Sequence, residues 1–580
     1  MLKKLFPYIK DYGRAALLAP LLVMAEAIAE LILPRLMANI IDNGIDGDGG
    51  FPYILRQGLI MVGIALLCIV AGTLSMRFSA RASQGFGYNL RKAMFEHTQR
   101  FSFADIDRFS SGSLITRLTN DVNNIQNMVN MGLRMVIRAP VMMIFALIMC
   151  FTIHARLTLV LVAVIPLMAA GVAFIMTRAH KLFGTMQKRI DGVNTAVQEN
   201  LIAIRVVKAF VREDHEKQKF GQAVDALRDS AIRAVTTIVF MQPIMQLSFN
   251  LAMVFILWFG GRYVMKSELF TGDLYAFLSY IGNVLMSVMM LAFTLLQVTR
   301  ARASADRIVE VLDTVPDIRD GDGAAKRELP APAGRVEFRD VSFRYAAGAG
   351  DDVLSHIDLT VAPGQFVAVI GGTGVGKSSL VNLIPRFYDV TGGQVLVDGL
   401  DVRDYPVEAL RGRIGMVLQN NVLFSGTIRE NLLWGDPEAT EEQLIEAAKN
   451  AQAWEFIQKL PQGLDTFIEQ GGVNVSGGQK QRLCIARAML RRPSILILDD
   501  STSAVDTATE AEIRRSFREN LKGTTVLIIA QRISSVRYAD KIVILEDDHV
   551  ADEGTHDELM ARSAIYQEIY ASQQEGTVGD

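Results

Sequence analysis

The sequence predicts an all-α membrane domain of six helices, followed by an α/β domain built around a phosphate-binding loop. Half of the 580 residues are hydrophobic, mean hydropathy is +0.25, and the excess lies before about residue 298. After residue 335, short apolar runs typical of buried strands take over, and one leads into a glycine-rich loop. A segment rich in Gly, Pro, Asp and Ala separates the two halves. We therefore expect domains at 1–305 and 335–580, joined by a linker at 306–334.

Six apolar stretches in the first half can each cross about 30 Å of hydrocarbon as a helix. They cover residues 15–41, 59–76, 136–153, 157–177, 235–258 and 274–298. The N-terminus and the long segments 77–134 and 178–233 are rich in Lys and Arg, whereas the loop after the first stretch is acidic. By the positive-inside rule, both termini and the α/β domain lie in the cytoplasm, with the chain in the cell (inner or plasma) membrane.

A phosphate loop opens the second half. The apolar run 366–370 leads directly into the pattern G-x-x-x-x-G-K-[ST] at 371–378. Glycines let the backbone N–H groups approach phosphate oxygens, and the helix that follows presents its positive end to the same anion. We expect Lys377 to reach the β- and γ-phosphates and Ser378 to bind Mg²⁺. The residues expected to hold the nucleotide here are Gly371, Gly374, Gly376, Lys377, Ser378 and Ser379.

A second acidic site follows the apolar run 494–498. Asp499 stands at the end of this predicted strand, where a carboxylate of phosphate-loop enzymes holds the Mg²⁺ shell. An aspartate that merely begins a turn is the alternative. The phosphate loop upstream favours the metal role.

The segment Val475-Ser476-Gly477-Gly478-Gln479-Lys480-Gln481-Arg482 resembles the signature of ATP-binding cassette (ABC) proteins, with valine in place of the usual leucine. The resemblance covers about 336–568. It implies that a helix beginning near Gln479 presents its N-terminal end to ATP bound on a second cassette. It also implies adenine stacking on Tyr345, Mg²⁺ sensing by Gln419 and a loop at 503–506 that crosses the dimer interface. The nucleotide contacts implied at the signature are Ser476, Gly477, Gly478 and Gln479.

The first half resembles the membrane domain of ABC exporters with six helices per chain. Residues 112–121 resemble the first intracellular loop of that family and residues 198–213 the second. The resemblance implies a short coupling helix in each loop that presses on the cassettes. We place these helices near 113–120 and 207–214. Solvated helix surface is the plainer interpretation of either segment taken alone.

Two positions depart from the family's hydrolytic pattern. Asp500 stands where a glutamate usually positions the attacking water, and a misplacement of about 1 Å can cost about 100-fold in rate. Gln531 replaces the switch histidine, so it can donate a hydrogen bond but cannot carry a proton. Together, the two changes predict impaired hydrolysis at the chain's own ATP–Mg²⁺ site.

The signature remains complete, and in this family a cassette lends its signature to the other site of a dimer. We therefore expect a non-identical ABC half-transporter as partner, with a glutamate after its metal-binding aspartate and a switch histidine. The chain would be one half of a heterodimeric multidrug or lipid-like exporter. The alternatives are a slowly hydrolysing homodimer, an ATP-gated or regulatory protein, and an importer of the same fold.

Glu26 and Glu30 lie one helical turn apart in the first stretch, where ionisable groups are costly. They could face an aqueous cavity, where they would attract amphipathic cations or titrate with transport, or they could pair with a basic residue or lie near an interface. Methionines, whose flexible side chains re-pack around varied ligands, are candidates for the same role, although ordinary packing explains most of them. The candidates used below are Met286, Met289 and Met290. We find no nucleic-acid motif, and three cysteines imply no disulfide framework.

Overall fold

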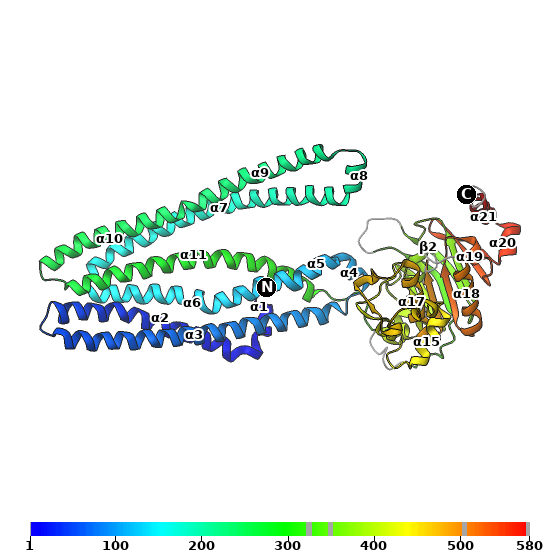
Figure 1. Ribbon diagram of the computed structural model, residues 1–580, viewed down its shortest axis with the longest axis horizontal. Helices are drawn as coiled ribbons and strands as arrows, with labels where there is room; N and C mark the ends of the chain where they lie inside the picture. The colour runs from blue at the N-terminus through cyan, green and yellow to red at the C-terminus, as the bar shows by residue number, and fades with distance from the viewer. Residues whose placement is uncertain (1, 321–327, 346–351, 501–506, 576–580) are drawn as a thin grey trace. The chain divides into compact units, whose positions relative to one another are not determined.

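The computed structural model describes residues 2–320, 328–345, 352–500 and 507–575. The chain divides into two compact units, and the division is not a single cut in the sequence. The first unit comprises Met1–Thr98 and Gly112–Thr314, and the second comprises Gln99–Ser111 and Val315–Asp580 (Figure 1). A short segment between two membrane helices thus belongs with the α/β unit.

The first unit is entirely helical, and the predicted six spans are confirmed. Among the described residues, six apolar helical stretches are long enough to cross a membrane: Phe6–Ile45, Gly50–Thr98, Ser111–Ile153, Ala155–Ile202, Glu213–Met265 and Thr271–Leu291. Most extend far beyond the apolar segments read from the sequence. The helix Gly50–Thr98, for example, has 49 residues, which at 1.5 Å per residue makes it about 75 Å long. Since hydrocarbon accounts for only about 30 Å, the rest projects into water.

Within this unit, α2, α3, α6 and α11 pack together, whereas α7 pairs with α9 and α10 (Figure 1). Small residues allow the close approaches: a Cβ on Gly85 of α3 would lie 2.2 Å from the Tyr12 ring. The elements are α1 (Leu2–Leu5), a 3-10 turn (Phe6–Tyr12), α2 (Gly13–Asn39), a π-turn (Ile40–Ile45), α3 (Gly50–Thr98), α5 (Ser111–Thr116), a π-turn (Arg117–Asp121), α6 (Val122–Ile153), α7 (Ala155–Ile202), α8 (Ile204–Ala209), α9 (Glu213–Val239), α10 (Met241–Met265) and α11 (Thr271–Asp313).

The first predicted coupling segment, 113–120, lies in the helical unit and is tied to α11. Asp121 is buried and pairs with Arg307, while Ser304 donates to the same carboxylate at 2.8 Å. Arg117 pairs with Glu310 at 2.8 Å. The short helix that belongs with the α/β unit is instead α4 (Phe103–Phe109), which precedes the predicted segment. The second predicted segment, 207–214, overlaps α8.

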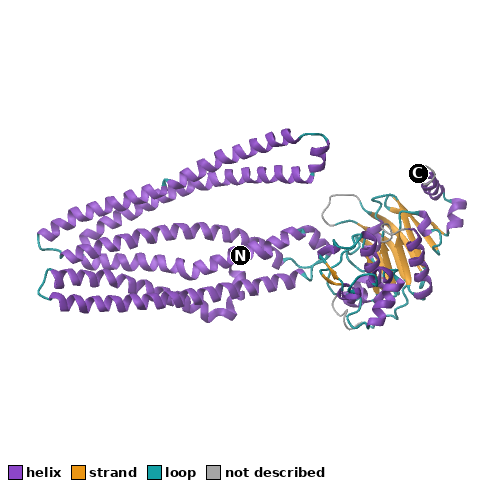
Figure 2. Cartoon of the chain, viewed as in Figure 1, coloured by secondary structure: helices purple, strands orange, loops and turns teal. Residues whose placement is uncertain are grey.

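The second unit is α/β, so the predicted fold class is confirmed (Figure 2). Its main sheet has the order β12-β11-β3-β10-β9-β6 and is parallel except for β12. The strands of this sheet are β3 (Phe366–Gly371), β6 (Ile414–Val417), β9 (Ile495–Asp499), β10 (Thr525–Ile529), β11 (Lys541–Glu546) and β12 (His549–Gly554).

A smaller antiparallel sheet has the order β2-β1-β4-β5, and β7 pairs with β8. These strands are β1 (Val336–Phe343), β2 (Leu354–Val361), β4 (Gly392–Val397), β5 (Leu400–Asp401), β7 (Gly426–Thr427) and β8 (Phe467–Ile468). The helices are α12 (Lys377–Leu383), α13 (Val407–Gly412), α14 (Ile428–Leu433), α15 (Glu441–Asn450), α16 (Trp454–Ile457), α17 (Gly477–Leu490), α18 (Thr507–Asn520), α19 (Ile533–Val536), α20 (His556–Arg562) and α21 (Ala564–Glu575).

The central strands explain the continuous apolar runs of the sequence. Side chains alternate between two faces along a strand, and both faces of β3 are covered: Ala368 and Ile370 join one core, Val367 and Val369 the other. Because β3, β9 and β10 are parallel neighbours, their carboxyl ends meet at one edge of the sheet. That edge carries the phosphate loop and the two aspartates.

Candidate nucleotide site

The phosphate loop requires glycine at positions where its backbone turns. Gly371, Gly374 and Gly376 have φ values of 151°, 89° and 87°, a region that side chains with a Cβ rarely adopt. A Cβ on Gly371 would lie 2.2 Å from the Leu545 carbonyl oxygen, and one on Gly376 would lie 2.8 Å from the Val353 carbonyl oxygen. The loop therefore keeps its backbone open towards an anion.

Lys377 begins α12 and folds over the loop. Its Nζ donates a 2.9 Å hydrogen bond to the Gly371 carbonyl and also contacts the Gly372 carbonyl. Burial lowers the pKa of Lys377, while Asp500 and Asp499 oppose that shift. A half-buried ammonium beside two carboxylates and a ring of backbone dipoles suits a polyphosphate.

Ser378 and Asp499 come together as the sequence predicts. The Ser378 hydroxyl donates to the Asp499 carboxylate at 2.9 Å, although the residues lie 121 positions apart. Burial raises the pKa of Asp499 and the neighbouring Asp500 adds to this, whereas the Ser378 hydrogen bond lowers it. A hydroxyl and a carboxylate oxygen are the donors that Mg²⁺ prefers, so the two residues fit a metal ion, whose charge would offset the cost of burying Asp499.

Asp500 and Gln531 are hydrogen-bonded to each other. The Gln531 Nε2 donates to the Asp500 Oδ2 at 2.8 Å. The Asp500 backbone has a positive φ of 46°, and its N–H donates to the Ile529 carbonyl at 3.2 Å. Burial raises the pKa of Asp500, while Lys377 and Gln531 lower it. The two departures from the family pattern therefore form one contact.

The signature segment caps α17 with its own side chains. The Ser476 hydroxyl accepts from the Gln479 N–H at 3.3 Å, and the Gln479 side chain accepts from the Ser476 N–H at 3.0 Å. This reciprocal arrangement is a capping box. Ser476 and Gly477 are exposed, and Gly478 is partly exposed. The Gln479 side chain is thus occupied within the chain, while the helix end is presented outwards.

Tyr345 connects the segment after β1 with the phosphate-loop helix. Its hydroxyl lies 2.8 Å from the Ser379 hydroxyl, and its ring meets the Tyr388 ring edge-on at 5.1 Å between centroids. The Tyr345 side chain is 38% exposed, which leaves ring surface for a base to stack on. The Ser379 hydroxyl, predicted among the phosphate-loop contacts, bonds to Tyr345 and is buried.

The sequence did not single out α4, which packs on the α/β unit near this tyrosine. The Phe103 ring packs at a tilt against the Phe387 ring with centroids 4.4 Å apart, and the Tyr388 hydroxyl donates to the Asp107 carboxylate at 2.9 Å. A signal was available, because Ser102 and Asp105 form a capping box that begins the helix. The second unit therefore includes a segment, Gln99–Ser111, that lies far in sequence from the rest of that unit, which begins at Val315.

Two further predicted elements follow strands β6 and β9 in the sequence. Gln419 is exposed and follows β6, the edge strand beside β9, so it lies on the same side of the sheet as Asp499. The interface loop predicted at 503–506 lies outside the described residues.

The candidate substrate residues of the membrane half are two ion-paired glutamates and three methionines that differ in exposure. Arg138 of α6 bridges both carboxylates of α2, at 2.6 Å to Glu26 and 2.5 Å to Glu30, so the pairing alternative is the one observed. The three groups carry two negative charges and one positive charge. Among the methionines, Met286 is 61% exposed, whereas Met289 and Met290 are partly buried.

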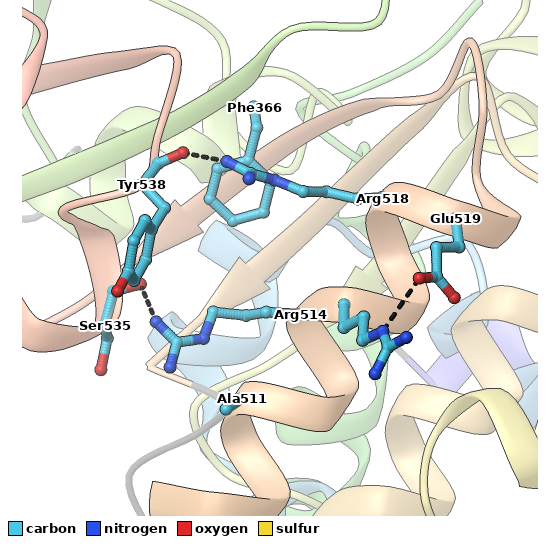
Figure 3. A pocket seen from close by; sticks show the side chains of 8 residues that line it. Phe366, Ala511, Arg514, Arg518, Glu519, Ser535 and Tyr538 are labelled. Carbon is cyan, nitrogen blue, oxygen red and sulfur yellow. Dashed lines mark hydrogen bonds and ion pairs between the residues drawn. The ribbon is translucent and has the colours of Figure 1, made fainter.

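A separate pocket of about 330 Å³ lies at the opposite edge of the main sheet, beside Phe366 at the start of β3. It contains none of the predicted site residues. Arg514 of α18 donates to the Ser535 carbonyl at 2.9 Å, and Arg518 donates to the Tyr538 carbonyl (Figure 3). These arginines fasten α18 to the segment that follows Gln531.

Six membrane helices joined to an α/β unit with a phosphate loop, a carboxylate hydrogen-bonded to the loop serine and a capped signature helix define an ATP-driven transporter half. Residues 16–289 match the family model of the ABC transporter transmembrane region, and residues 354–503 match that of the ABC transporter. The chain belongs to the ABC transporter family.

Its relatives include exporters. An uncharacterized ABC transporter ATP-binding protein of Bacillus subtilis, YfiB, is 40% identical over 99% of this chain and 98% of that protein. The putative multidrug export ATP-binding/permease protein YgaD of the same organism is 33% identical over 99% of both. The ATP-dependent lipid A-core flippase of Syntrophus aciditrophicus is 36% identical over 85% of this chain and 81% of that protein.

A solved structure of a bacterial Atm1-family ABC exporter with ATP bound superposes with a TM-score of 0.81, at 25% identity over 97% of this chain and 98% of that chain. The chain is thus a multi-pass ABC exporter subunit, in a family that acts as dimers and couples ATP hydrolysis to transport.

Proposed function

We propose that this chain is the weakly hydrolysing half of a heterodimeric exporter in the cell membrane, with its cassette in the cytoplasm. The contact between Asp500 and Gln531 carries the proposal. Asp500 is one methylene shorter than glutamate, and the amide of Gln531 holds its carboxylate. The shorter carboxylate is poorly placed to orient water even while the Gln531 amide holds it in position, and Gln531 cannot take up a proton, so only slow residual hydrolysis is left.

The chain's own site still suits ATP and Mg²⁺. Lys377 and the loop glycines would hold the phosphates, and Ser378 and Asp499 would hold Mg²⁺, with Gln419 near the same edge. Bound Mg²⁺ would supply charge neutralisation on the phosphates. Tyr345 would stack on the adenine. The chain therefore retains ATP binding while losing much of its hydrolysis.

The signature helix supports a productive role in a second site. Its capping box holds the first turn of α17 rigid, and Ser476, Gly477 and Gly478 lie at the outward-facing end. Helix N-termini favour anions. A partner that carries the usual glutamate and switch histidine would complete a hydrolytic site against this end.

The exposed apolar surface at α8, in the second intracellular loop, also favours a dimer. Val206, Phe210 and Val211, on and beside α8, are 56%, 72% and 80% exposed. An apolar tip of this kind is typical of a docking element. We infer that α8 docks on the partner's cassette while α4 remains on its own.

ATP turnover by the purified chain, with and without its partner, tests this proposal. The chain alone should turn over little ATP, and activity should appear when the partner copurified from native membranes is added. Asp500→Asn should reduce turnover of the complex far less than the matching change in the partner. Robust turnover by the chain alone would instead favour the slowly hydrolysing homodimer. Transport that continues without hydrolysis would favour a regulatory or ATP-gated protein.

For the substrate, we propose an amphipathic small molecule of the drug or lipid class, as the names of two relatives suggest. The excess negative charge of Glu26, Glu30 and Arg138 favours cations, and Met286, Met289 and Met290 offer adaptable apolar contacts. Uptake by inverted vesicles of a cationic dye and its neutral analogue tests the preference and the direction. Glu30→Gln should reduce transport of the cation selectively; equal loss for both dyes would refute a charge-based preference.

A further inference from the structure

The segment 531–538 contains the switch residue Gln531 and is held from two sides. From one side, Arg514 and Arg518 of α18 donate to its carbonyls at Ser535 and Tyr538 (Figure 3). From the other side, the last described helix of the chain, α21, packs near the segment and makes side-chain hydrogen bonds to the backbone at its beginning. The side chain that makes them is Gln573.

Gln573 makes two hydrogen bonds that bracket Arg532. Its Nε2 donates to the Gln531 carbonyl at 2.8 Å. Its Oε1 accepts from the Ile533 N–H, also at 2.8 Å. One side-chain amide thus pairs with a carbonyl and an N–H of the switch backbone, as a neighbouring peptide group would in a sheet. Ile533 is the first residue of α19, so the bond also satisfies a donor that has no partner within the helix.

The rest of α21 is anchored independently. Tyr566 is fully buried, and its hydroxyl lies 2.8 Å from the His556 Nδ1. Ile569 and Tyr570 pack against the core beneath. The helix therefore has a buried anchor of its own, and Gln573 extends from it towards the switch segment.

We propose that Gln573 is a positioning residue for the nucleotide site: it sets the backbone of Gln531, whose side-chain amide in turn holds Asp500. Three successive hydrogen bonds of 2.8 Å, to Ile533, Gln531 and Asp500, carry this inference. The proposal rests on the proposed role of Gln531 and Asp500 at the bound ATP. It adds that the C-terminal helix controls their geometry without touching the nucleotide.

The experiment uses the full chain with its partner in proteoliposomes. A photoreactive azido-ATP is first bound to the complex, and light then crosslinks it to this chain after a series of waiting times. The rate at which uncleaved azido-ATP disappears from the crosslinked chain reports turnover at this chain's site. Gln573→Ala should slow that loss by about three- to tenfold, the range expected for one or two hydrogen bonds, with little change in the ATP concentration needed for half-saturation. Gln567→Ala is the matched control, because Gln567 lies on the same helix and its amide donates to the Met560 carbonyl at 2.7 Å. It should behave as wild type.

Gln573→Glu distinguishes a role in positioning the switch backbone from a merely structural role of the side chain. The introduced carboxylate can accept from the Ile533 N–H but cannot donate to the Gln531 carbonyl. Acidification protonates it and restores a donor, so its rate relative to wild type should recover as the pH falls. A defect equal at all pH values, or one shared by Gln567→Ala, would overturn the proposal.

Gln531→Ala distinguishes a failure of this inference from a failure of the proposed function. If Gln531→Ala leaves the loss rate unchanged, the role assigned to Gln531 is wrong, and the positioning proposal falls with it. If Gln531→Ala slows the loss but Gln573→Ala does not, only the positioning proposal is overturned. The double variant should match Gln531→Ala alone, because Gln573 acts through Gln531; additive effects would show a different route.

Discussion

The Tyr388 hydroxyl donates a 2.9 Å hydrogen bond to the Asp107 carboxylate, which joins segments 281 residues apart in the sequence. The Tyr388 ring also meets the Tyr345 ring edge-on, and Tyr345 is hydrogen-bonded to Ser379 beside the phosphate loop. Burial raises the pKa of Tyr388, so its hydroxyl keeps its proton at physiological pH. A continuous set of contacts therefore runs from α4 to the nucleotide site.

Tyr388→Phe should weaken the coupling between hydrolysis and transport, because it removes the bond to Asp107 and keeps the ring. We expect the amount of substrate moved per ATP hydrolysed to fall by about three- to tenfold, measured in vesicles. Tyr405→Phe is the control, since the Tyr405 hydroxyl donates to the Val397 carbonyl at 2.9 Å inside the cassette. Unchanged stoichiometry in Tyr388→Phe would show that this contact carries no coupling.

Two glycines of the phosphate loop should respond differently to alanine. Gly374 and Gly376 have nearly equal φ values of 89° and 87°, so each substitution pays a similar backbone cost of about 1 kcal/mol. Only at Gly376 does the new Cβ also collide, 2.8 Å from the Val353 carbonyl oxygen, because nothing lies within 4 Å at Gly374. Gly376→Ala should therefore lose more ATP affinity in a fluorescent-nucleotide titration. Equal losses would contradict the steric explanation.

The protein should be more stable when all three charges of the Glu26, Glu30 and Arg138 cluster are removed than when Arg138 alone is replaced. Arg138→Leu leaves the partly buried Glu26 and Glu30 without their shared cation, and an uncompensated charge within a membrane span costs about 3 kcal/mol. The triple variant Glu26→Gln, Glu30→Gln, Arg138→Leu should recover much of that loss. Thermal unfolding of the detergent-solubilised protein checks the order. A triple variant as unstable as Arg138→Leu would mean that the cluster has another structural role.

The nucleotide-free protein should gain stability when Asp500 loses its charge. Burial raises the folded-state pKa of Asp500 above 3.8, so the folded state is penalised once the carboxyl ionises, and stability from this group falls as the pH rises through that raised pKa. Asp500→Asn should therefore raise the unfolding temperature near pH 7, and the gain should vanish towards pH 4.

Asp398→Asn gives the opposite control. Its carboxylate pairs with Arg413 at 3.2 Å and accepts from the Gly334 and Arg335 N–H groups, so neutralising it should lower the unfolding temperature at pH 7. If Asp500→Asn lowers the unfolding temperature instead, the contacts of the Asp500 carboxylate stabilise the folded state by more than the burial of its charge destabilises it.

The membrane spans and the backbone turns of the phosphate loop were predictable from the sequence because their signals are local. Apolar runs mark helices and buried strands, and the glycines of 371–376 stand where the backbone demands them. Ser378 and Asp499 were each expected to hold Mg²⁺, and the hydrogen bond between their side chains is consistent with that shared role.

Relations set by tertiary packing were not predictable. Nothing local indicates that Arg138 reaches Glu26 and Glu30, so the sequence left their role open. The segment 113–120 was placed as a coupling helix from its resemblance, whereas ion pairs hold it to α11 and the cassette grips α4 instead. Gln573 gave no signal at all, because a glutamine near a chain end is ordinary until its partners are known.

The placement of residues 99–111 with the cassette has a consequence for exchanging parts between transporters. A cassette transplanted into a relative at a single junction near residue 315 would leave behind the helix that packs on Phe387 and Tyr388, and would meet a foreign one. In such a chimera each domain could fold, but the host's helix would not fit the surface of the transplanted cassette. A successful transplant must carry two pieces of sequence, and the smaller one, cut from between two membrane helices, is the easier to overlook.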